Sequence, residues 1–364
     1  MGVQRLPLHV AIMNDHASAL GAWQHALKGN YLPATVLHID RHSDLASPNR
    51  CRMIPKSSPG AWAACVDRAG FQVAAAWLGL IDRIWWFAPG SDDRESSVWR
   101  FGKVCTSRQG WPELTLEGDD VDDDEQPSVA SPALGKVLQI REGSFHELRE
   151  LRSLESSIRH VPVLLDIDLD YWGGALGPLQ PPWEAPSLRS CGNLLRQCGA
   201  AGWAARRCHV NSLWVSLLAD PNATVDIEPV NISTDSLVEG CRRDLQKRYR
   251  DPQTRHFFRK AYAAGLSLPE ALLAELPQDI KECGHVDEEQ LIGLLQPLTP
   301  LVVTIARSVD GYIPFHCSVP LEDAVLRILR RAFNSTLELE YLAGTAPIAA
   351  LRSMYSSEAG AAFD

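Results

Sequence analysis

The sequence lacks a long hydrophobic run, a surplus of basic residues and a closely spaced pair of cysteines. Its most apolar stretch, 71–81 (FQVAAAWLGLI), is far shorter than the roughly 18 residues that a membrane helix needs, and its first residues show no signal-peptide pattern, so we expect no membrane association. The net charge of −10 argues against a general nucleic-acid binder, which needs a basic face. The nine cysteines include no CxxC motif, so we expect reduced thiols in a cytoplasmic protein.

Short apolar segments alternate with helix-like segments along the chain. The expected strands are nearly continuous apolar runs, which is typical of parallel strands covered on both faces: 8–13, 34–39, 81–89, 161–169, 212–218 and 301–308. The expected helices between them are 17–28, 60–79, 143–156 and 187–204. This order predicts an α/β fold with a doubly wound, mainly parallel sheet. We expect one domain over 1–364, with a candidate helical insertion at about 240–293.

A first group of metal-ligand residue types lies at the end of the run 34–39. Asp40, His42 and Asp44 alternate with other residues, so they would share one face if the strand stayed extended. His38 has the same parity but lies deeper, and we expect it to be a satisfied core histidine rather than a ligand.

A second group follows the apolar run in VLLDIDLDYW (163–172). Asp166, Asp168 and Asp170 share parity, and buried carboxylates must be paired or must coordinate a metal. Both groups lie at the carboxyl end of a strand, where open parallel sheets place their ligands. A carboxylate-rich set without thiolates favours Mn²⁺ over zinc, with Mg²⁺ or Fe²⁺ less favoured. The set has enough carboxylates for two ions that share bridging ligands, which predicts metal-assisted hydrolysis.

These motifs resemble the arginase and agmatinase ureohydrolases. Asp40-Arg41-His42-Ser43-Asp44 matches their DxHxD motif, Ile167-Asp168-Leu169-Asp170 matches their later DxD motif, and His16 stands where they carry an upstream histidine ligand. The chain is most similar to the arginase-like family that includes the peptide arginases. The similarity runs in order through 14–20, 37–45, 79–89, 165–172 and 306–314.

The resemblance implies an arginase-like three-layer αβα fold and two Mn²⁺ ions. His16, Asp40, Asp44 and Asp168 would hold one ion, and Asp40, His42, Asp168 and Asp170 would hold the other. Asp166 could replace Asp168 if the register slips by two residues. The resemblance also implies that metal-activated water attacks the guanidinium carbon of an arginine side chain in a ribosomally made precursor peptide. Asp170 or Asp166 would help to move the proton, and urea would leave while ornithine remains in the peptide.

Several departures from ordinary arginases bear on the substrate. The Gly-Gly before their Asp-His is Met13-Asn14 here, and after Asp44 the next histidine is His146, so their proton-shuttle histidine has no local counterpart. These losses favour arginine within a peptide over free arginine. For the guanidinium we expect Asp310 as carboxylate partner, with Tyr312 and Trp172 stacking on the substrate.

Other interpretations remain open. Asp310 could be a turn residue, the two aromatic residues could belong to the core, and Arg307 and Glu322 could simply pair with each other. A ureohydrolase acting on free arginine or agmatine, a dinuclear phosphoesterase and a deacetylase are the alternative enzymes, although no GNH segment of a phosphoesterase is present. A metal-dependent binding module is the non-enzymatic alternative. A homo-oligomer is also left open.

Overall fold

The structure is a computed structural model of the 364-residue chain. It describes residues 6–29, 33–48, 51, 54, 57–89, 99–107, 111–116, 136–143, 161–173, 186–188, 190–191, 193, 232–264, 266, 268–274, 283–309, 312–342 and 345–355. The chain divides into two compact units. Unit 1 comprises Met1–Gly174, Gly284–Ser308 and Leu321–Leu342, and unit 2 comprises Ala175–Cys283, Val309–Pro320 and Ala343–Asp364.

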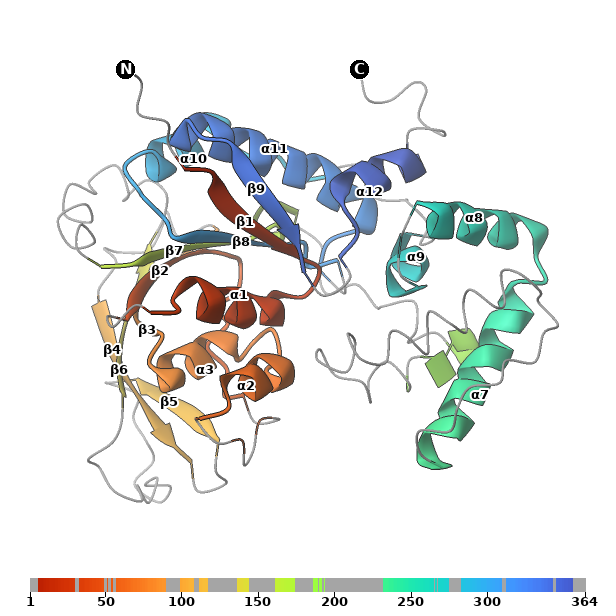
Figure 1. Cartoon of the computed structure of the whole chain (residues 1–364), viewed down its shortest axis with the longest axis horizontal. Helices are drawn as coiled ribbons and strands as arrows, with labels where there is room; N and C mark the ends of the chain where they lie inside the picture. Colours follow the sequence, from red (N-terminus) through yellow and green to blue (C-terminus); the bar gives the residue numbers. More distant parts are fainter. Residues whose placement is uncertain are drawn as a thin grey trace. The chain divides into compact units, whose positions relative to one another are not determined.

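Unit 1 contains a nine-stranded sheet in the order β5-β4-β6-β3-β2-β7-β8-β1-β9 (Figure 1). The strands are β1 (Leu8–Met13), β2 (Ala34–Ile39), β3 (Ile81–Phe87), β4 (Trp99–Thr106), β5 (Pro112–Leu116), β6 (Lys136–Gly143), β7 (Val163–Asp168), β8 (Val302–Ala306) and β9 (Leu337–Tyr341). The pairings from β6 to β9 are parallel, whereas β4 is antiparallel to both β5 and β6. The sheet is therefore mixed and mostly parallel.

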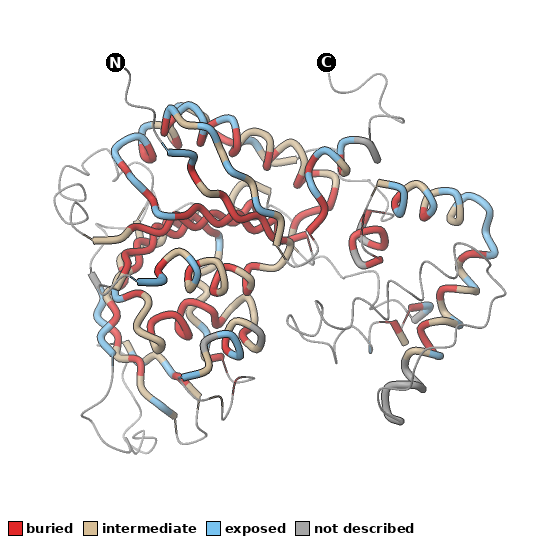
Figure 2. The backbone as a smooth tube through the Cα atoms, in the orientation of Figure 1, coloured by how far each residue is buried: buried red, intermediate tan, exposed pale blue. Residues whose placement is uncertain are grey.

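The central strands are buried on both faces. Every residue of β2, β7 and β8 is buried, and Figure 2 shows these strands as a continuous buried layer. This burial is what the continuous apolar runs predict, because a parallel strand between two helical layers has no solvent-facing side. The edge strand β9 instead alternates half-buried and exposed residues.

Helices cover both faces of this sheet. They are η1 (His16–Ser18), α1 (Ala19–Ala26), α2 (Pro59–Cys65), α3 (Phe71–Leu78), the short α5 (Asp170–Gly173), α10 (Glu288–Leu295) and α11 (Phe315–Phe333), whose residues from Leu321 belong to unit 1. In Figure 1, α1, α2 and α3 lie on one side of the sheet, and α10 and α11 lie on the other. The α/β class and the mainly parallel sheet are confirmed, with three layers.

The differences from the expected elements have local causes. The expected helix 60–79 is two helices, because the chain turns over residues 66–70 between α2 and α3. The strands β4, β5, β6 and β9 were not expected, because their sequences mix polar and apolar residues; β5 and β9 form the two edges of the sheet. The expected strand 212–218 and most of the expected helices 143–156 and 187–204 lie outside the described residues.

Unit 2 is helical in its described part. It contains η8 (Pro186–Leu188), α7 (Ile232–Arg248), α8 (Pro252–Ala263), α9 (Leu268–Ala274), α12 (Ile348–Tyr355) and the start of α11. A core of its own includes Tyr249 and Phe258, whose rings meet edge to face at 5.2 Å. The expected insertion at about 240–293 stays a prediction: α7, α8 and α9 lie in unit 2, whereas α10 lies in unit 1.

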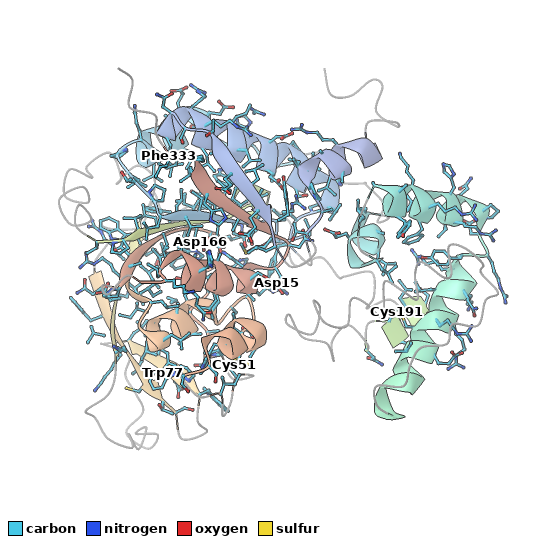
Figure 3. The ribbon with its side chains drawn as sticks, viewed as in Figure 1. Asp15, Cys51, Trp77, Asp166, Cys191 and Phe333 are labelled. Carbon is cyan, nitrogen blue, oxygen red and sulfur yellow. A yellow bond between two sulfur atoms is a disulfide. The ribbon has the colours of Figure 1, made fainter. Side chains whose placement is uncertain are left out.

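The cysteines differ from the expectation of reduced thiols. The structure pairs six of them as Cys51–Cys65, Cys191–Cys241 and Cys283–Cys317, and Figure 3 labels Cys51 near α2 and Cys191 near α7. The partners are 14, 50 and 34 residues apart in the sequence. The fold brings them together, and no short cysteine spacing motif predicts the pairs. Cys105 is unpaired among the described residues.

Within the described residues, no helix has the length and apolar character that crossing a bilayer requires.

Candidate metal centre

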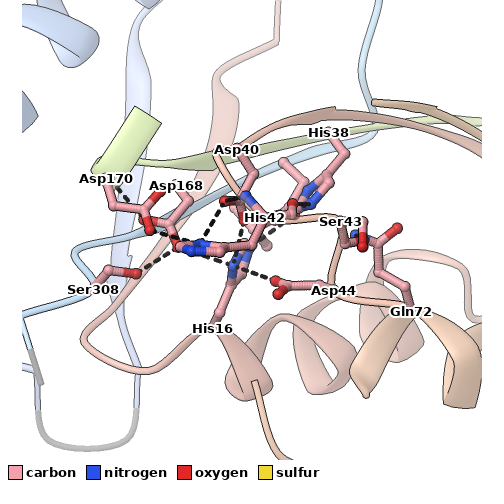
Figure 4. Close-up of polar contacts among 12 residues, drawn as sticks. His16, His38, Asp40, His42, Ser43, Asp44, Gln72, Asp168, Asp170 and Ser308 are labelled. Carbon is pink, nitrogen blue, oxygen red and sulfur yellow. Dashed lines mark hydrogen bonds and ion pairs between the residues drawn. The ribbon is translucent and has the colours of Figure 1, made fainter. Parts of the chain in front are cut away.

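The predicted ligands gather at one edge of the sheet in unit 1. Asp40 directly follows β2, Asp168 ends β7, Ser308 lies two residues after β8, and His16 begins η1 after β1. These four strands are neighbours in the order β2-β7-β8-β1. Because they are parallel, their carboxyl ends bring the following residues together, as Figure 4 shows.

The two DxD-like motifs share one local structure. The Asp40 Oδ1 accepts a hydrogen bond of 2.7 Å from the His42 backbone N–H, and the Asp168 Oδ1 accepts one of 2.9 Å from the Asp170 backbone N–H. Such aspartate turns bend the chain at the strand end. The condition that the strand stay extended through Asp44 is not met, because β2 ends at Ile39. The predicted side chains nevertheless converge, through turns instead of strand alternation.

His16 is the centre of the first ligand group. The Asp15 side chain accepts a hydrogen bond of 3.0 Å from the Ala17 N–H and so caps the short helix that His16 begins. The His16 Nδ1 lies 3.3, 3.1 and 3.2 Å from oxygens of Asp40, Asp44 and Asp168. These three aspartates and His16 are the four ligands expected for the first ion. Adjacent ligands of an octahedral ion with bonds of about 2.1 Å lie about 3 Å apart, so the spacing fits one small divalent ion.

His42 is the centre of the second group. Its Nδ1 lies 3.0 Å from Asp170 Oδ2 and 3.6 Å from Asp40 Oδ1, so Asp40 belongs to both groups. The His42 side chain is 42% exposed, whereas Asp40 and Asp170 are almost fully buried. The second group therefore lies on the solvent side of the first.

Asp166 has a different environment from the other carboxylates. Its Oδ2 accepts hydrogen bonds of 2.8 Å from both His16 Nε2 and His38 Nδ1, and its Oδ1 accepts one from the Thr304 hydroxyl. With both oxygens engaged and no exposed surface, Asp166 orients imidazoles. The geometry thus favours the register with Asp168 and Asp170 as ligands, and it gives Asp166 no oxygen with which to move a proton.

His38 is satisfied, as the sequence predicted. Its Nδ1 hydrogen-bonds to Asp166, and its Nε2 donates a hydrogen bond of 3.0 Å to the His42 carbonyl. Neither ring nitrogen therefore has a lone pair directed at the two ligand groups, and His38 supports the loop that carries His42.

Several buried atoms at the centre fit a metal. His16 Nδ1, Asp40 Oδ2 and both oxygens of Asp170 make no hydrogen bond of acceptable geometry with any described residue. Buried polar atoms without partners are costly, which makes a missing ligand the simplest explanation. Since His16 donates through Nε2 to Asp166, its Nδ1 lone pair is left for a metal, the usual arrangement of a metal-bound histidine held by a carboxylate. The donor set of carboxylates and imidazoles suits Mn²⁺.

The histidines of the centre favour their charged forms when no metal is bound. Burial lowers the pKa of His16, but the carboxylates of Asp166, Asp168 and Asp40 raise it by more, to well above the usual range. The carboxylates of Asp170 and Asp40 beside His42 raise its pKa to about 10. Cations are therefore stabilised strongly at this position.

The carboxylates divide into two classes. Burial raises the pKa of Asp166, yet His16 and His38 lower it by more, to about 2. Burial, followed by the charges of Asp170 and Asp40, raises the pKa of Asp168 well above its usual range. Asp166 therefore favours its ionised form, whereas a positive charge bound beside Asp168 would favour ionisation of its carboxyl group.

Two residues at the centre have a left-handed backbone conformation. Asp44 has a φ of 50° and Ser308 a φ of 49°. Such conformations are uncommon outside glycine and are concentrated at functional sites, where surrounding contacts hold them. At Ser308 the contact is the hydroxyl, which donates a hydrogen bond of 2.5 Å to Asp168 Oδ2.

Sequence reasoning missed the residues that hold the ligands in place. Thr304 and Ser308 donate to Asp166 and Asp168, the Trp86 indole donates to the Asp40 carbonyl at 2.9 Å, and the Gln72 amide donates to the Ser43 carbonyl at 3.2 Å. A signal was available for two of them. Thr304 interrupts the apolar strand VVTIA, and Gln72 interrupts the apolar helix FQVAAAWL, and a buried polar residue needs a partner.

The predicted substrate residues are less well described. Asp310 lies outside the described residues, and Tyr312 and Trp172 are both half-buried. The Trp172 ring packs edge to face on Tyr171, with centroids 5.0 Å apart. Their substrate roles stay predictions. The pairing of Arg307 with Glu322 is present, with Nε donating to Oε2 at 2.6 Å and both side chains fully buried.

No family model matches the chain, and no curated protein matches it.

Proposed function

We propose that the protein is a Mn²⁺-dependent hydrolase that converts arginine side chains of a precursor peptide to ornithine and releases urea, and that its three-layer fold is arginase-like. The observation that carries the proposal is the pair of ligand groups that share Asp40, around His16 Nδ1 and His42 Nδ1. The specific substrate rests on the resemblance of the sequence motifs to peptide arginases.

The residues of the centre would have two roles, binding the ions and orienting the ligands. His16, Asp40, Asp44 and Asp168 would hold one ion, and Asp40, His42, Asp168 and Asp170 would hold the other. When bound, such a pair supplies a water of lowered pKa and stabilises developing negative charge. Asp166 fixes the tautomer of His16, and Ser308 fixes the rotamer of Asp168.

Asp170 is the better candidate for moving a proton. Its carboxylate accepts no hydrogen bond from any described residue, and it lies beside the half-exposed His42, whereas both oxygens of Asp166 are occupied. A general acid or base must have a free position for the proton that it transfers. If one oxygen of Asp170 bound the ion, its second oxygen would remain for the proton, whereas both oxygens of Asp166 are occupied by His16, His38 and Thr304.

The test uses the purified full chain loaded with Mn²⁺. It is incubated with an arginine-containing peptide and, separately, with free arginine, while mass spectrometry follows the peptide and a urea assay follows the product. We expect urea together with ornithine in the peptide, and loss of both in Asp168→Ala. Glu338→Gln, an exposed acid on the edge strand β9, is the matched control and should retain activity. Urea from free arginine alone would refute the peptide substrate, and no urea from either would refute the ureohydrolase assignment.

A further inference from the structure

Another set of metal-ligating side chains belongs to unit 2 and shares no residue with the carboxylate centre of unit 1. It consists of Cys283, His316 and Cys317, whose ligand atoms all lie within 4.8 Å of one another. His316 and Cys317 are in the first turn of α11, and Cys283 precedes α10 in the chain. Cys283 and Cys317 are paired as a disulfide, with their Cα atoms 5.1 Å apart.

The donor chemistry of this group differs from that of the first centre. Two sulfur atoms and one imidazole form a soft, nitrogen- and sulfur-rich set, which suits Zn²⁺ and does not suit Mn²⁺. Cys317 is 1% exposed, whereas Cys283 and His316 are half-buried. An ion bound here would be anchored in the protein on one side and reachable from solvent on the other.

The spacing allows either a disulfide or a metal. Two thiolates at about 2.3 Å from a tetrahedral zinc lie about 3.8 Å apart, which side-chain rotation can provide once the sulfur–sulfur bond is broken. The other two pairs offer a contrast. Among the described residues, neither Cys51–Cys65 nor Cys191–Cys241 belongs to a group with a third ligand.

We propose that Cys283, His316 and Cys317 form a Zn²⁺ site when the disulfide is reduced, so that zinc and the disulfide exclude each other. A dithiol reductant supplies two electrons and two protons, which convert the disulfide to two thiols while the reductant closes to its own disulfide. Zn²⁺ then displaces the two thiol protons and binds two thiolates and the imidazole. The fourth position of the tetrahedron is left for water or another donor.

Cobalt(II) is the probe for this site, because only thiolate ligands give an intense sulfur-to-cobalt charge-transfer band in the near ultraviolet. The full chain is reduced with a dithiol, freed of the reductant and titrated with Co²⁺. We expect one equivalent to produce the band, added Zn²⁺ to abolish it, and the oxidised protein to show none. Absence of the band in the reduced protein would overturn the proposal.

Variants assign the band to these three residues. Cys283→Ser and Cys317→Ser should lose it, whereas Cys51→Ser and Asp40→Asn should keep it, because they alter another disulfide and the other centre. His316→Asn leaves both cysteines in place and should shift the band and weaken binding, which keeps the test decisive if the cysteine variants fail to fold. A band retained in both Cys283→Ser and Cys317→Ser, or unchanged in His316→Asn, would refute the three-residue site.

Discussion

Replacing Asp166 by asparagine tests whether this carboxylate acts through His16 or binds metal itself. Asparagine has the same shape, and its amide can still meet the donors at 2.8 Å from His16 and His38, but it removes the negative charge. Charge-assisted hydrogen bonds are roughly twice as strong as neutral ones. Loss of such a partner behind a metal-bound histidine costs about 10–100-fold in metal affinity, or about 1.4–2.8 kcal/mol.

Isothermal titration with Mn²⁺ separates the two roles. We expect Asp166→Asn to bind two ions per chain, one of them with the weakened affinity. Thr304→Val is the matched control: it keeps the carboxylate and removes the hydroxyl that donates to Asp166 and accepts from the Trp23 indole, so it should cost about 1–3 kcal/mol of folding stability and less than tenfold in Mn²⁺ affinity. Unchanged affinity in Asp166→Asn would refute the positioning role. Loss of a whole ion would make Asp166 a ligand and refute the preferred register.

Three further predictions follow from the geometry. Mn²⁺ binding below pH 10 should release protons and tighten as pH rises, because the pKa of His42 is about 10 without metal and ligation needs the neutral imidazole. Isothermal titration calorimetry in two buffers of different ionisation enthalpy measures the number of protons released. Arg307→Met should destabilise the fold by about 3–5 kcal/mol in urea unfolding because the buried Glu322 carboxylate loses its charge-assisted hydrogen bond from the Arg307 Nε, and adding Glu322→Leu should recover most of the loss. Ser308→Ala should weaken Mn²⁺ binding by about 0.5–1.5 kcal/mol, and an unchanged affinity would show that its hydroxyl does not position Asp168.

The central sheet and the convergence of the ligands could be predicted from the sequence. Each of β1, β2, β7 and β8 lies in a nearly continuous apolar run, and the register of parallel strands fixes where their carboxyl ends meet. His38 opposite Asp166 in the β2–β7 pairing is one result of that register. The hydrophobic pattern, with the rule that parallel strands end at the same edge of a sheet, was sufficient to predict that the two motifs lie at one edge, whereas the order of the strands comes from the structure.

The finer structure of the centre could not be predicted in the same way. The turns at Asp40 and Asp168 depend on side-chain to backbone hydrogen bonds that form only where the strand ends. The role of Asp166 depends on the imidazoles of His16 and His38 around it. The alternation of Asp166, Asp168 and Asp170 in the sequence therefore could not show that the first orients histidines whereas the other two are candidate metal ligands. The disulfide pairs depend on contacts between segments 14 to 50 residues apart, which no local pattern encodes.

The central proposal is that residues at this edge of the sheet would hold two Mn²⁺ ions close together, with Asp40 and Asp168 serving as ligands to both. Electron paramagnetic resonance at low temperature, on the full chain loaded with two equivalents of Mn²⁺, tests it most directly. The account predicts the multiline spectrum of an exchange-coupled manganese pair, and its disappearance in Asp168→Ala. A spectrum of isolated Mn²⁺ ions alone in the unmodified chain would contradict the account.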